Sequence, residues 1–299
     1  MFIRLWLFAY LSSAQAGELL PVGSTAMCAD HPVAMMVDSA ELSRDEFSKT
    51  FRLKSRPDSD CAGESPKKAL RTEGFCSAVL VAPDVVLTAS HCLEGGRSCN
   101  ANLSFVFDMR DPQANIPESN VYHCKEVLKS GNRKSNGHYG DYAFVRLDRP
   151  VSGRKAITTI SKKTFVAEQD QLVVVGYPAG LGLREGSGPF VFGENLYPAT
   201  AEVAGAMGGV SGGPVFYKDP RSGTCHLAGI VLGYDRMDSA RKSGIKCADG
   251  MTKNHAVGYL PIGEVTDVFN FEKGSFIEKR APTLWERLMG PKSETSTVR

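Results

Sequence analysis

The sequence predicts an all-β protein with a short helix near its C-terminal end. Short apolar runs rich in strand-forming residues recur along the chain, and turn residues such as Ala82-Pro83-Asp84 separate them. Helical texture is found mainly near the end of the chain, at residues 262–271 and 283–289. Many short strands with few helices are typical of a β-barrel or a β-sandwich.

The expected elements follow one another in two groups. Residues 55–68 are polar and rich in turn formers, which indicates a loop. The first group of expected strands covers residues 75–81, 85–88, 103–107, 121–128 and 142–147. The second group covers residues 172–175, 214–217 and 227–232. Residues 180–200 are rich in Gly and Pro, which indicates an exposed loop, and the polar tail from residue 290 is expected to fray.

Length and composition indicate a soluble globular protein. A chain of 299 residues is long enough for two compact domains or one large one. Apolar residues make up 42% of it and charged residues 23%, which are ordinary values. The formal net charge is only +2, so neither nucleic acid nor a membrane surface is expected as a partner.

The first residues have the features of a secretory signal. Arg4 precedes an apolar run at residues 5–11, and Ala14-Gln15-Ala16 has the small residues of a cleavage site. An uncleaved membrane anchor would need an apolar stretch of about 20 residues, far longer than this run. We therefore expect residues 1–16 to be removed and the protein to be secreted or periplasmic, with no membrane attachment afterwards.

The eight cysteines favour disulfides over a metal site. They are Cys28, Cys61, Cys76, Cys92, Cys99, Cys124, Cys225 and Cys247. An even number behind a signal peptide is typical of an oxidising compartment. No CxxC pair occurs, and the other spacings do not match zinc-ligand patterns. The sequence therefore predicts no metal and no cofactor.

Three local patterns carry residues suited to nucleophilic catalysis. His91 lies just past the expected strand 85–88, Asp141 lies just before the strand 142–147, and Ser211 lies in a glycine-rich turn that opens the strand 214–217. A serine hydroxyl needs a neighbouring base, histidine supplies one near neutral pH, and a buried carboxylate orients the histidine. Each residue alone has an ordinary structural explanation, but the three contexts in this order favour a catalytic triad.

The glycines around the serine suit a second requirement of acyl transfer. The tetrahedral intermediate carries a negative oxygen, which two backbone N–H groups can stabilise by several kcal/mol, on the order of 3–4 for one donor. Glycine lets the backbone turn sharply and approach the substrate. We expect the N–H groups of Gly209 and Ser211 to form this oxyanion hole.

These patterns resemble the chymotrypsin-like serine peptidases. Thr88-Ala89-Ser90-His91-Cys92 is similar to that family's Thr-Ala-Ala-His-Cys. The stretch 141–147 is similar to Asp-Ile-Ala-Leu-Leu-x-Leu, and the stretch 209–214 to Gly-Asp-Ser-Gly-Gly-Pro. The resemblance implies two six-stranded antiparallel β-barrels with the active site between them, a disulfide between Cys76 and Cys92, and protein or peptide substrates.

The resemblance also implies a domain organisation. Residues 17–70 would be an N-terminal extension or propeptide, residues 71–155 the first barrel, residues 156–272 the second barrel and residues 273–299 a tail. His91 and Asp141 would come from the first barrel and Ser211 from the second. Proximity in the sequence suggests three further disulfides: Cys99 with Cys124, Cys225 with Cys247 and Cys28 with Cys61.

The departures from the family pattern are informative. Val210 replaces the family's aspartate before the serine, so it cannot form an ion pair with a newly cut N-terminus. Met207 stands where a cysteine of the second barrel is expected, and the interval from Asp141 to Ser211 is short. Together with Gly176-Tyr177-Pro178, these features resemble the bacterial glutamyl-endopeptidase-like branch.

The side-chain preference of the primary specificity pocket is predicted from four residues. Gly205 and Ala206 stand where trypsin-like enzymes have the acid that selects Lys or Arg, and Val231 stands where glutamyl endopeptidases have a histidine. With Tyr234, these residues predict a pocket for an uncharged side chain of small to medium size.

The expected function is a secreted serine endopeptidase with little activity below about pH 5.5, where His91 would be charged. An α/β-hydrolase also has Gly-x-Ser-x-Gly, but Pro214 and the apolar run after it predict a strand where that fold needs a helix. A non-catalytic binding protein on the same fold stays open, because Val210 departs from the family pattern at the oxyanion hole. The sequence carries no prediction of oligomeric state.

Overall fold

The structure is a computed structural model. It describes residues 20–21, 28, 32–57, 70–95, 97, 99, 102–131, 140–163, 165, 170–191, 199–202, 208–236 and 255–277. Within these ranges the regular elements are β-strands and 3-10 helices of three or four residues, and the predicted all-β class is confirmed. No helix in the described part is both long and apolar enough to cross a membrane. The signal peptide predicted at residues 1–16 lies outside the described residues.

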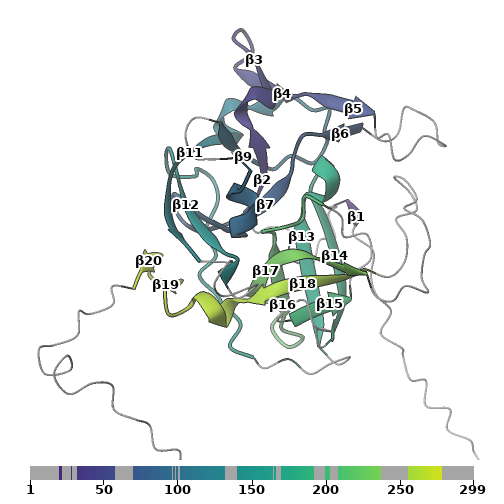
Figure 1. The fold of residues 1–299 in the computed structure, drawn as a ribbon, viewed down its shortest axis with the longest axis vertical. Helices are drawn as coiled ribbons and strands as arrows, with labels where there is room; N and C mark the ends of the chain where they lie inside the picture. Colours follow the sequence, from purple (N-terminus) through teal and green to yellow (C-terminus); the bar gives the residue numbers. More distant parts are fainter. Residues whose placement is uncertain are drawn as a thin grey trace, which may run out of the picture.

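Six antiparallel strands close into the first barrel, in the upper half of Figure 1. In spatial order they are β11 (Val121–Ser130), β12 (Ala143–Leu147), β8 (Val85–Thr88), β7 (Cys76–Ala82), β2 (Val33–Asp38) and β9 (Leu103–Phe107). Every residue of β7 is buried, which explains its uninterrupted run of apolar and small side chains. The turn predicted at residues 82–84 joins β7 to β8.

The predicted start of the first barrel at residue 71 is wrong. β2 lies in the region expected to be an extension, yet it pairs with both β7 and β9 and is needed to close the barrel. Its first five residues are at most 2% exposed. An apolar run of this length without distinctive turn signals is not diagnostic of a barrel strand, which is why the sequence did not place it.

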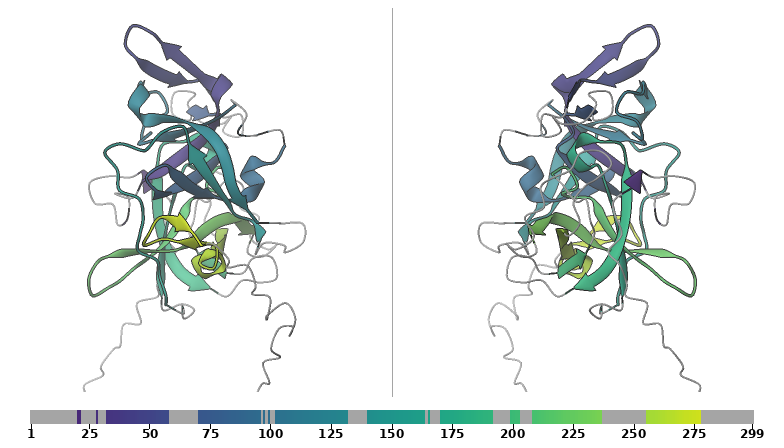
Figure 2. Two further views of the ribbon diagram at one scale, coloured as in Figure 1. Left: turned by 90° about the vertical axis from the view of Figure 1, so that its left-hand side faces the viewer. Right: turned by 90° about the vertical axis from the view of Figure 1, so that its right-hand side faces the viewer.

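A hairpin follows β2 and projects from the end of the first barrel (Figure 2). It consists of β3 (Leu42–Asp45) and β4 (Thr50–Leu53), and β10 (Ile116–Pro117) adds to its edge. β5 (Ser55–Pro57) pairs with β6 (Leu70–Thr72), so the first three residues of the predicted loop 55–68 form a strand, and its partner strand begins two residues after the loop. The residues between them lie outside the described ranges.

The second barrel is a seven-stranded sheet in the lower half of Figure 1. Its order is β1 (Leu20–Pro21), β14 (Arg184–Val191), β13 (Gln171–Gly176), β16 (Pro214–Lys218), β17 (Cys225–Arg236), β18 (His255–Pro261) and β15 (Ala199–Glu202). β14 also pairs with β15, which joins the six strands other than β1 into a ring. This arrangement agrees with the predicted two-barrel fold.

The prediction of an exposed loop over residues 180–200 is wrong for its centre. β14 occupies part of it, pairs with β13 along six residues and is largely buried. Gly and Pro are turn signals in the sequence, but in the structure Gly186 and Gly188 each pair with a β13 residue. Sheet pairing on both sides thus overrides the local tendency of these residues to break a strand.

The two barrels pack through β13, whose two faces are both buried. Val173 and Val175 belong to the large hydrophobic core that includes the first barrel. Leu172 and Val174 belong to a separate core inside the second barrel. An uninterrupted apolar strand is expected where both faces are covered, and β13 therefore holds the residues that follow it against the first barrel.

The C-terminal helix is shorter than the sequence predicted. A 3-10 helix, η7 (Ile262–Val265), follows β18, and the chain then forms the hairpin of β19 (Phe269–Asn270) and β20 (Ser275–Phe276). The Phe144 ring lies 4.8 Å from that of Phe269 and 5.2 Å from that of Phe276. These rings pack onto the first barrel. The helix predicted to residue 271 therefore ends at Val265, and the hairpin extends to residue 276, past the predicted start of the tail at residue 273. The helix predicted at 283–289 lies outside the described residues.

Candidate active site

The pairing of β8 with β12 brings His91 and Asp141 together. Thr88 at the end of β8 lies opposite Ala143 at the start of β12, so the residues after one strand and before the other meet at the same edge of the barrel. His91 lies in the 3-10 turn η3 (Ser90–Leu93) directly after β8. Its Nδ1 lies 2.9 Å from Asp141 Oδ2. The histidine side chain is 23% exposed and the aspartate 1%, so the pair has one accessible end.

Three described groups of Ser90 and His91 hold the Asp141 carboxylate. Besides the His91 ring, its Oδ1 accepts the Ser90 hydroxyl at 2.9 Å and the His91 backbone N–H at 3.0 Å. Burial by itself raises the pKa of Asp141, but the hydrogen bonds and charge of His91 and the Ser90 hydroxyl outweigh it, and the net pKa is lowered. The carboxylate is therefore ionised at neutral pH in spite of its burial.

The loop at residues 208–213 presents Ser211 at the start of β16. Gly209 and Gly212 have φ angles of +102° and +79°, which side chains other than glycine rarely allow. The Gly213 N–H donates to Val210 O at 2.9 Å, and the Gly212 N–H donates to Val231 O at 2.7 Å. These hydrogen bonds hold the loop against β17 and fix the backbone conformation around Ser211.

The same loop contacts the first barrel directly beside His91. The Ser77 N–H donates to Ser211 O at 2.7 Å, and the Cys92 sulfur lies 3.8 Å from that oxygen. Cys92 follows His91 in the chain and forms the disulfide with Cys76 that the resemblance implies, with 6.1 Å between their Cα atoms. The structure thus brings Ser211 to the edge of the barrel that carries the His91–Asp141 pair.

The described disulfides correct two of the pairings suggested by proximity. Cys99 pairs with Cys124 as expected. Cys28 pairs with Cys225, 197 residues away, so the pairs Cys28–Cys61 and Cys225–Cys247 are wrong. Closeness in the sequence misled here because β1 and Cys28 both lie against the second sheet: β1 pairs with β14, and the Cys28 N–H donates to Glu185 Oε2 at 2.7 Å. Cys61 and Cys247 lie outside the described residues.

One group of side chains in the described part has the spacing of a metal site. The ligand atoms of Cys76, His91 and Cys92 lie within 4.8 Å of one another. The two sulfurs are joined in a disulfide, which offers no thiolate to an ion. The chemistry of this donor set therefore does not suit zinc.

The predicted specificity residues are only partly described. Gly205 and Ala206 lie outside the described residues, as does the Tyr234 side chain, although its backbone is part of β17. Val231 is fully buried in the core of the second barrel, and Val210 belongs to the same core. The valine before Ser211 is thus a packing residue of that core.

Sequence reasoning missed three polar contributors to this region: Ser77, Ser90 and the backbone of Tyr177. Ser77 is a fully buried hydroxyl in the apolar strand β7, one residue after Cys76. Ser90 directly precedes His91. A serine inside an otherwise apolar run was the available signal, because a buried hydroxyl needs hydrogen-bond partners.

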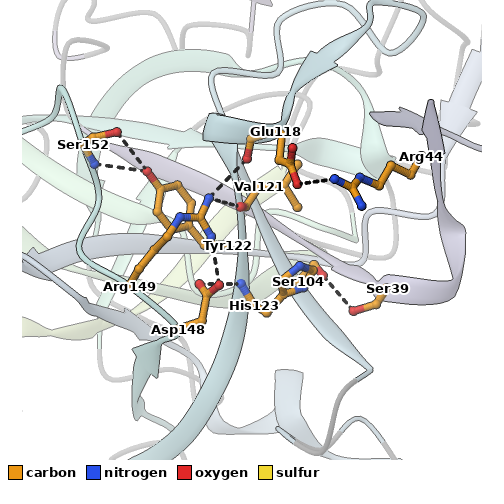
Figure 3. A network of polar contacts seen from close by, with 10 residues as sticks. All are labelled: Ser39, Arg44, Ser104, Glu118, Val121, Tyr122, His123, Asp148, Arg149 and Ser152. Carbon is orange, nitrogen blue, oxygen red and sulfur yellow. Dashed lines mark hydrogen bonds and ion pairs between the residues drawn. The ribbon is translucent and has the colours of Figure 1, made fainter. Parts of the chain in front are cut away.

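A second histidine in the first barrel lies in a different polar network (Figure 3). His123 of β11 places its Nδ1 2.9 Å from the hydroxyl of Ser104, which lies 2.7 Å from the hydroxyl of Ser39. A pocket of about 550 Å³ lies beside the His123 side chain. The pocket is lined by Lys49, Phe51, Pro117, Glu118, Ser119, Val121, His123, Asp148 and Arg149.

Comparison with known proteins agrees with the geometry. A family model described as trypsin matches residues 62–248, which is more than half of the chain. A glutamyl endopeptidase of Bacillus licheniformis is 29% identical over 167 residues, which make up 52% of this chain and 50% of the relative. The match thus spans about half the length of this relative.

Proposed function

Because the chain belongs to the trypsin family of serine peptidases, we propose that it is a secreted endopeptidase whose catalytic triad is Ser211, His91 and Asp141. The observation that carries this proposal is the hydrogen bond between His91 Nδ1 and a carboxylate that is 1% exposed. A buried carboxylate in this position holds the imidazole in one orientation and stabilises its charged form. That arrangement is what a general base for a serine requires.

The acylation step uses His91 as base and then as acid. Ser211 Oγ attacks the carbonyl carbon of the scissile peptide bond while His91 takes the hydroxyl proton. The tetrahedral intermediate collapses, the C–N bond breaks, and His91 gives the proton to the leaving amine. Asp141 keeps its charge throughout and stabilises the imidazolium.

Deacylation follows the same order of steps as acylation, with water in place of Ser211 as the nucleophile. His91 takes a proton from water, whose oxygen attacks the acyl carbon, and the ester bond to Ser211 then breaks. The carboxylic acid leaves, and the proton returns from His91 to Ser211 Oγ. Every group needed for these steps belongs to the chain, so the proposal includes no metal and no cofactor.

The oxyanion is assigned to the N–H groups of Gly209 and Ser211. Both peptide units are held on their carbonyl side, because Gly208 O accepts the Ala179 N–H at 2.5 Å and Val210 O accepts the Gly213 N–H at 2.9 Å. A planar trans peptide points its N–H away from its carbonyl. Among the described residues, neither N–H has a hydrogen-bond acceptor, which supports their availability to substrate.

The substrate preference is proposed from four positions. Gly205, Ala206, Val231 and Tyr234 bring no charge, so an uncharged P1 side chain of small to medium size is expected. The relative from Bacillus licheniformis is named for glutamyl specificity. Cleavage after Glu is therefore the result that would correct this assignment.

The proposed location is outside the cytoplasm, either secreted or periplasmic. The signal-like residues 1–16 and the three described disulfides support it. Protein or peptide chains are the proposed partners. Nucleic acid and, after signal cleavage, a membrane are not among them.

A peptide-library digest tests the activity and the preference together. Purified protein is incubated with a mixture of peptides, and the new termini are identified by mass spectrometry, with Ser211→Ala as the matched control. Cleavage by the wild type and none by the variant is expected, with Ala, Val or similar residues at P1. A folded wild type that cleaves no peptide would favour a binding protein on this scaffold instead.

A further inference from the structure

Ser77 lies in the first barrel but directs most of its hydrogen bonds to the second. It occupies the second position of β7 and is fully buried between Cys76 and Ala78. We propose that Ser77 is a positioning residue of the active site, whose hydroxyl holds the backbone that carries the oxyanion donors. This inference rests on the proposed function and adds to it a residue outside the triad.

The Ser77 hydroxyl is used as both donor and acceptor. It donates to Gly209 O at 2.8 Å and accepts the Tyr177 N–H at 3.0 Å. Gly209 belongs to the loop that carries Ser211, and Tyr177 begins the turn after β13. A buried hydroxyl bonded in both directions is fixed in orientation, so one side chain of the first barrel ties together two separate segments of the second.

The Ser77 backbone is fixed in the same way. Its N–H donates to Ser211 O at 2.7 Å, and its C=O accepts the Thr88 hydroxyl at 2.8 Å. Thr88 ends β8, the strand that leads into His91. A continuous chain of hydrogen bonds therefore runs from the histidine side of the site, through Ser77, to the serine loop.

These contacts determine how successive peptide planes of the loop are oriented. The peptide after Gly209 is held through its carbonyl by the Ser77 hydroxyl, and the peptide after Ser211 is held by the Ser77 N–H at one end and Val231 O at the other. Because each peptide is planar, rotation of the Gly209–Val210 unit would tilt the N–H groups on both sides of it. The hydroxyl thus acts on the oxyanion donors without touching the substrate.

The turn that follows β13 is part of the same assembly. η6 (Pro178–Gly180) places the Ala179 N–H 2.5 Å from Gly208 O, and the Tyr177 hydroxyl donates to Val33 O of β2 at 3.2 Å. Ser77 lies between this turn and the loop and contacts both. Loss of its hydroxyl would leave Gly209 O and the Tyr177 N–H buried without this partner.

The test compares Ser77→Ala with Ser104→Ala in the full chain. Ser104 is the matched control, because it is also a fully buried serine of the same barrel whose hydroxyl makes two hydrogen bonds. Its partners, Ser39 and His123, lie in the network away from the serine loop. Both variants remove the hydroxyl of a fully buried serine and two of its hydrogen bonds, so a purely structural role would affect them alike.

The expected result is a separation of kcat from stability. Ser77→Ala should lower kcat by about 10- to 100-fold with KM changed less than about threefold, because misplaced donors weaken the transition state more than the ground state. Its inhibition by a peptide aldehyde, whose adduct places an oxygen at the oxyanion site, should weaken by a similar factor. Ser104→Ala should keep kcat within about twofold. Ser77→Thr, which keeps the hydroxyl, should retain most of the activity and serves if the alanine variant does not fold.

Hydrogen exchange gives a readout that does not depend on turnover. Faster exchange in the peptide covering residues 208–213 is expected in Ser77→Ala and not in Ser104→Ala. An active wild type with an unchanged kcat in Ser77→Ala, or unchanged exchange in that peptide, overturns this inference alone. A folded wild type that neither hydrolyses peptides nor reacts with the aldehyde overturns the proposed function instead, and with it the positioning role.

Discussion

Two histidines of the first barrel each use Nδ1 in a polar network, and the networks differ in their partners. His91 faces the carboxylate of Asp141, which is 1% exposed and also accepts the Ser90 hydroxyl. His123 faces the neutral hydroxyl of Ser104 (Figure 3). Only the first arrangement stabilises a positive charge on the imidazole, which a general base acquires during catalysis.

A carboxylate also lies near His123, but it bonds the backbone of that residue, while the ring Nδ1 faces Ser104. Asp148 accepts the backbone N–H of His123 at 3.0 Å through one oxygen and an Arg149 N–H at 2.8 Å through the other. Arg149 further donates to the carbonyls of Glu118 and Val121 and lies 4.1 Å above the ring of Tyr122. This network connects Asp148 and Arg149 to β11 and so stabilises that side of the barrel, although the pocket of about 550 Å³ lies beside it. Similar residue types therefore serve different purposes, and the hydrogen-bond partners decide which.

The largest expected effect comes from Asp141→Asn. The amide leaves the shape of the site but removes the charge that faces His91, so kcat should fall by about 10⁴-fold. Steady-state kinetics with a cleaved peptide measures the loss, and circular dichroism checks the fold. A variant with more than a tenth of the wild-type kcat would show that the two histidine networks do not differ in the way described.

The next effect is pH-dependent and concerns Ser90→Ala. The pKa of Asp141 is lowered in the folded protein, so this carboxylate stabilises the fold above its unfolded pKa, and the contribution is lost as the pH falls through the folded pKa. Removal of the Ser90 hydroxyl should lower the free energy of unfolding by about 1.5–3 kcal/mol at pH 7. Urea denaturation from pH 7 to pH 3 should show this difference shrinking, and a constant difference would contradict the role given to Ser90.

Arg149→Ala tests whether the network around His123 contributes to stability and not to catalysis. The variant loses the contacts with Asp148, two carbonyls and the Tyr122 ring, and should unfold about 1–2 kcal/mol more easily. Its kcat/KM, measured well below the melting temperature, should stay within about twofold of the wild type. A large loss of kcat with an intact fold would give this region a role in the reaction.

The smallest effect is expected for His123→Ala. The Ser104 hydroxyl keeps its contact with Ser39, so the free energy of unfolding should fall by only about 0.5–1 kcal/mol. The pH profile of kcat/KM should match that of the wild type, because His123 takes no part in proton transfer. A shifted acid limb in this variant would contradict the distinction between the two histidines.

The sequence was most informative where a residue type is demanded by chemistry or by backbone geometry. The strands next to His91, Asp141 and Ser211 could be predicted because apolar runs and turn residues lie beside all three. The strand β2 and the Cys28–Cys225 disulfide were missed because both depend on contacts between distant parts of the chain. The centre of the predicted 180–200 loop became β14 for the same reason.

Within the candidate site, the sequence does not predict which serine hydroxyls support the catalytic residues. Ser77 and Ser90 are common residues without a diagnostic spacing, and their roles depend on which carbonyl or carboxylate the fold brings within 3 Å. The motif around Ser211 predicts a turn but does not reveal what holds it in place. The contact of Ser77 with this loop forms only when both barrels are placed against each other, and the contact of Ser90 with Asp141 forms only when β8 pairs with β12.

Mass spectrometry after reaction with a fluorophosphonate probe tests the central claim most directly. The probe reacts with a serine only when a neighbouring base activates it. The triad predicts a single adduct on Ser211 in the wild type, none in Ser211→Ala and much slower labelling in Asp141→Asn. A well-folded wild type without an adduct, or an adduct that persists in Ser211→Ala, would contradict it.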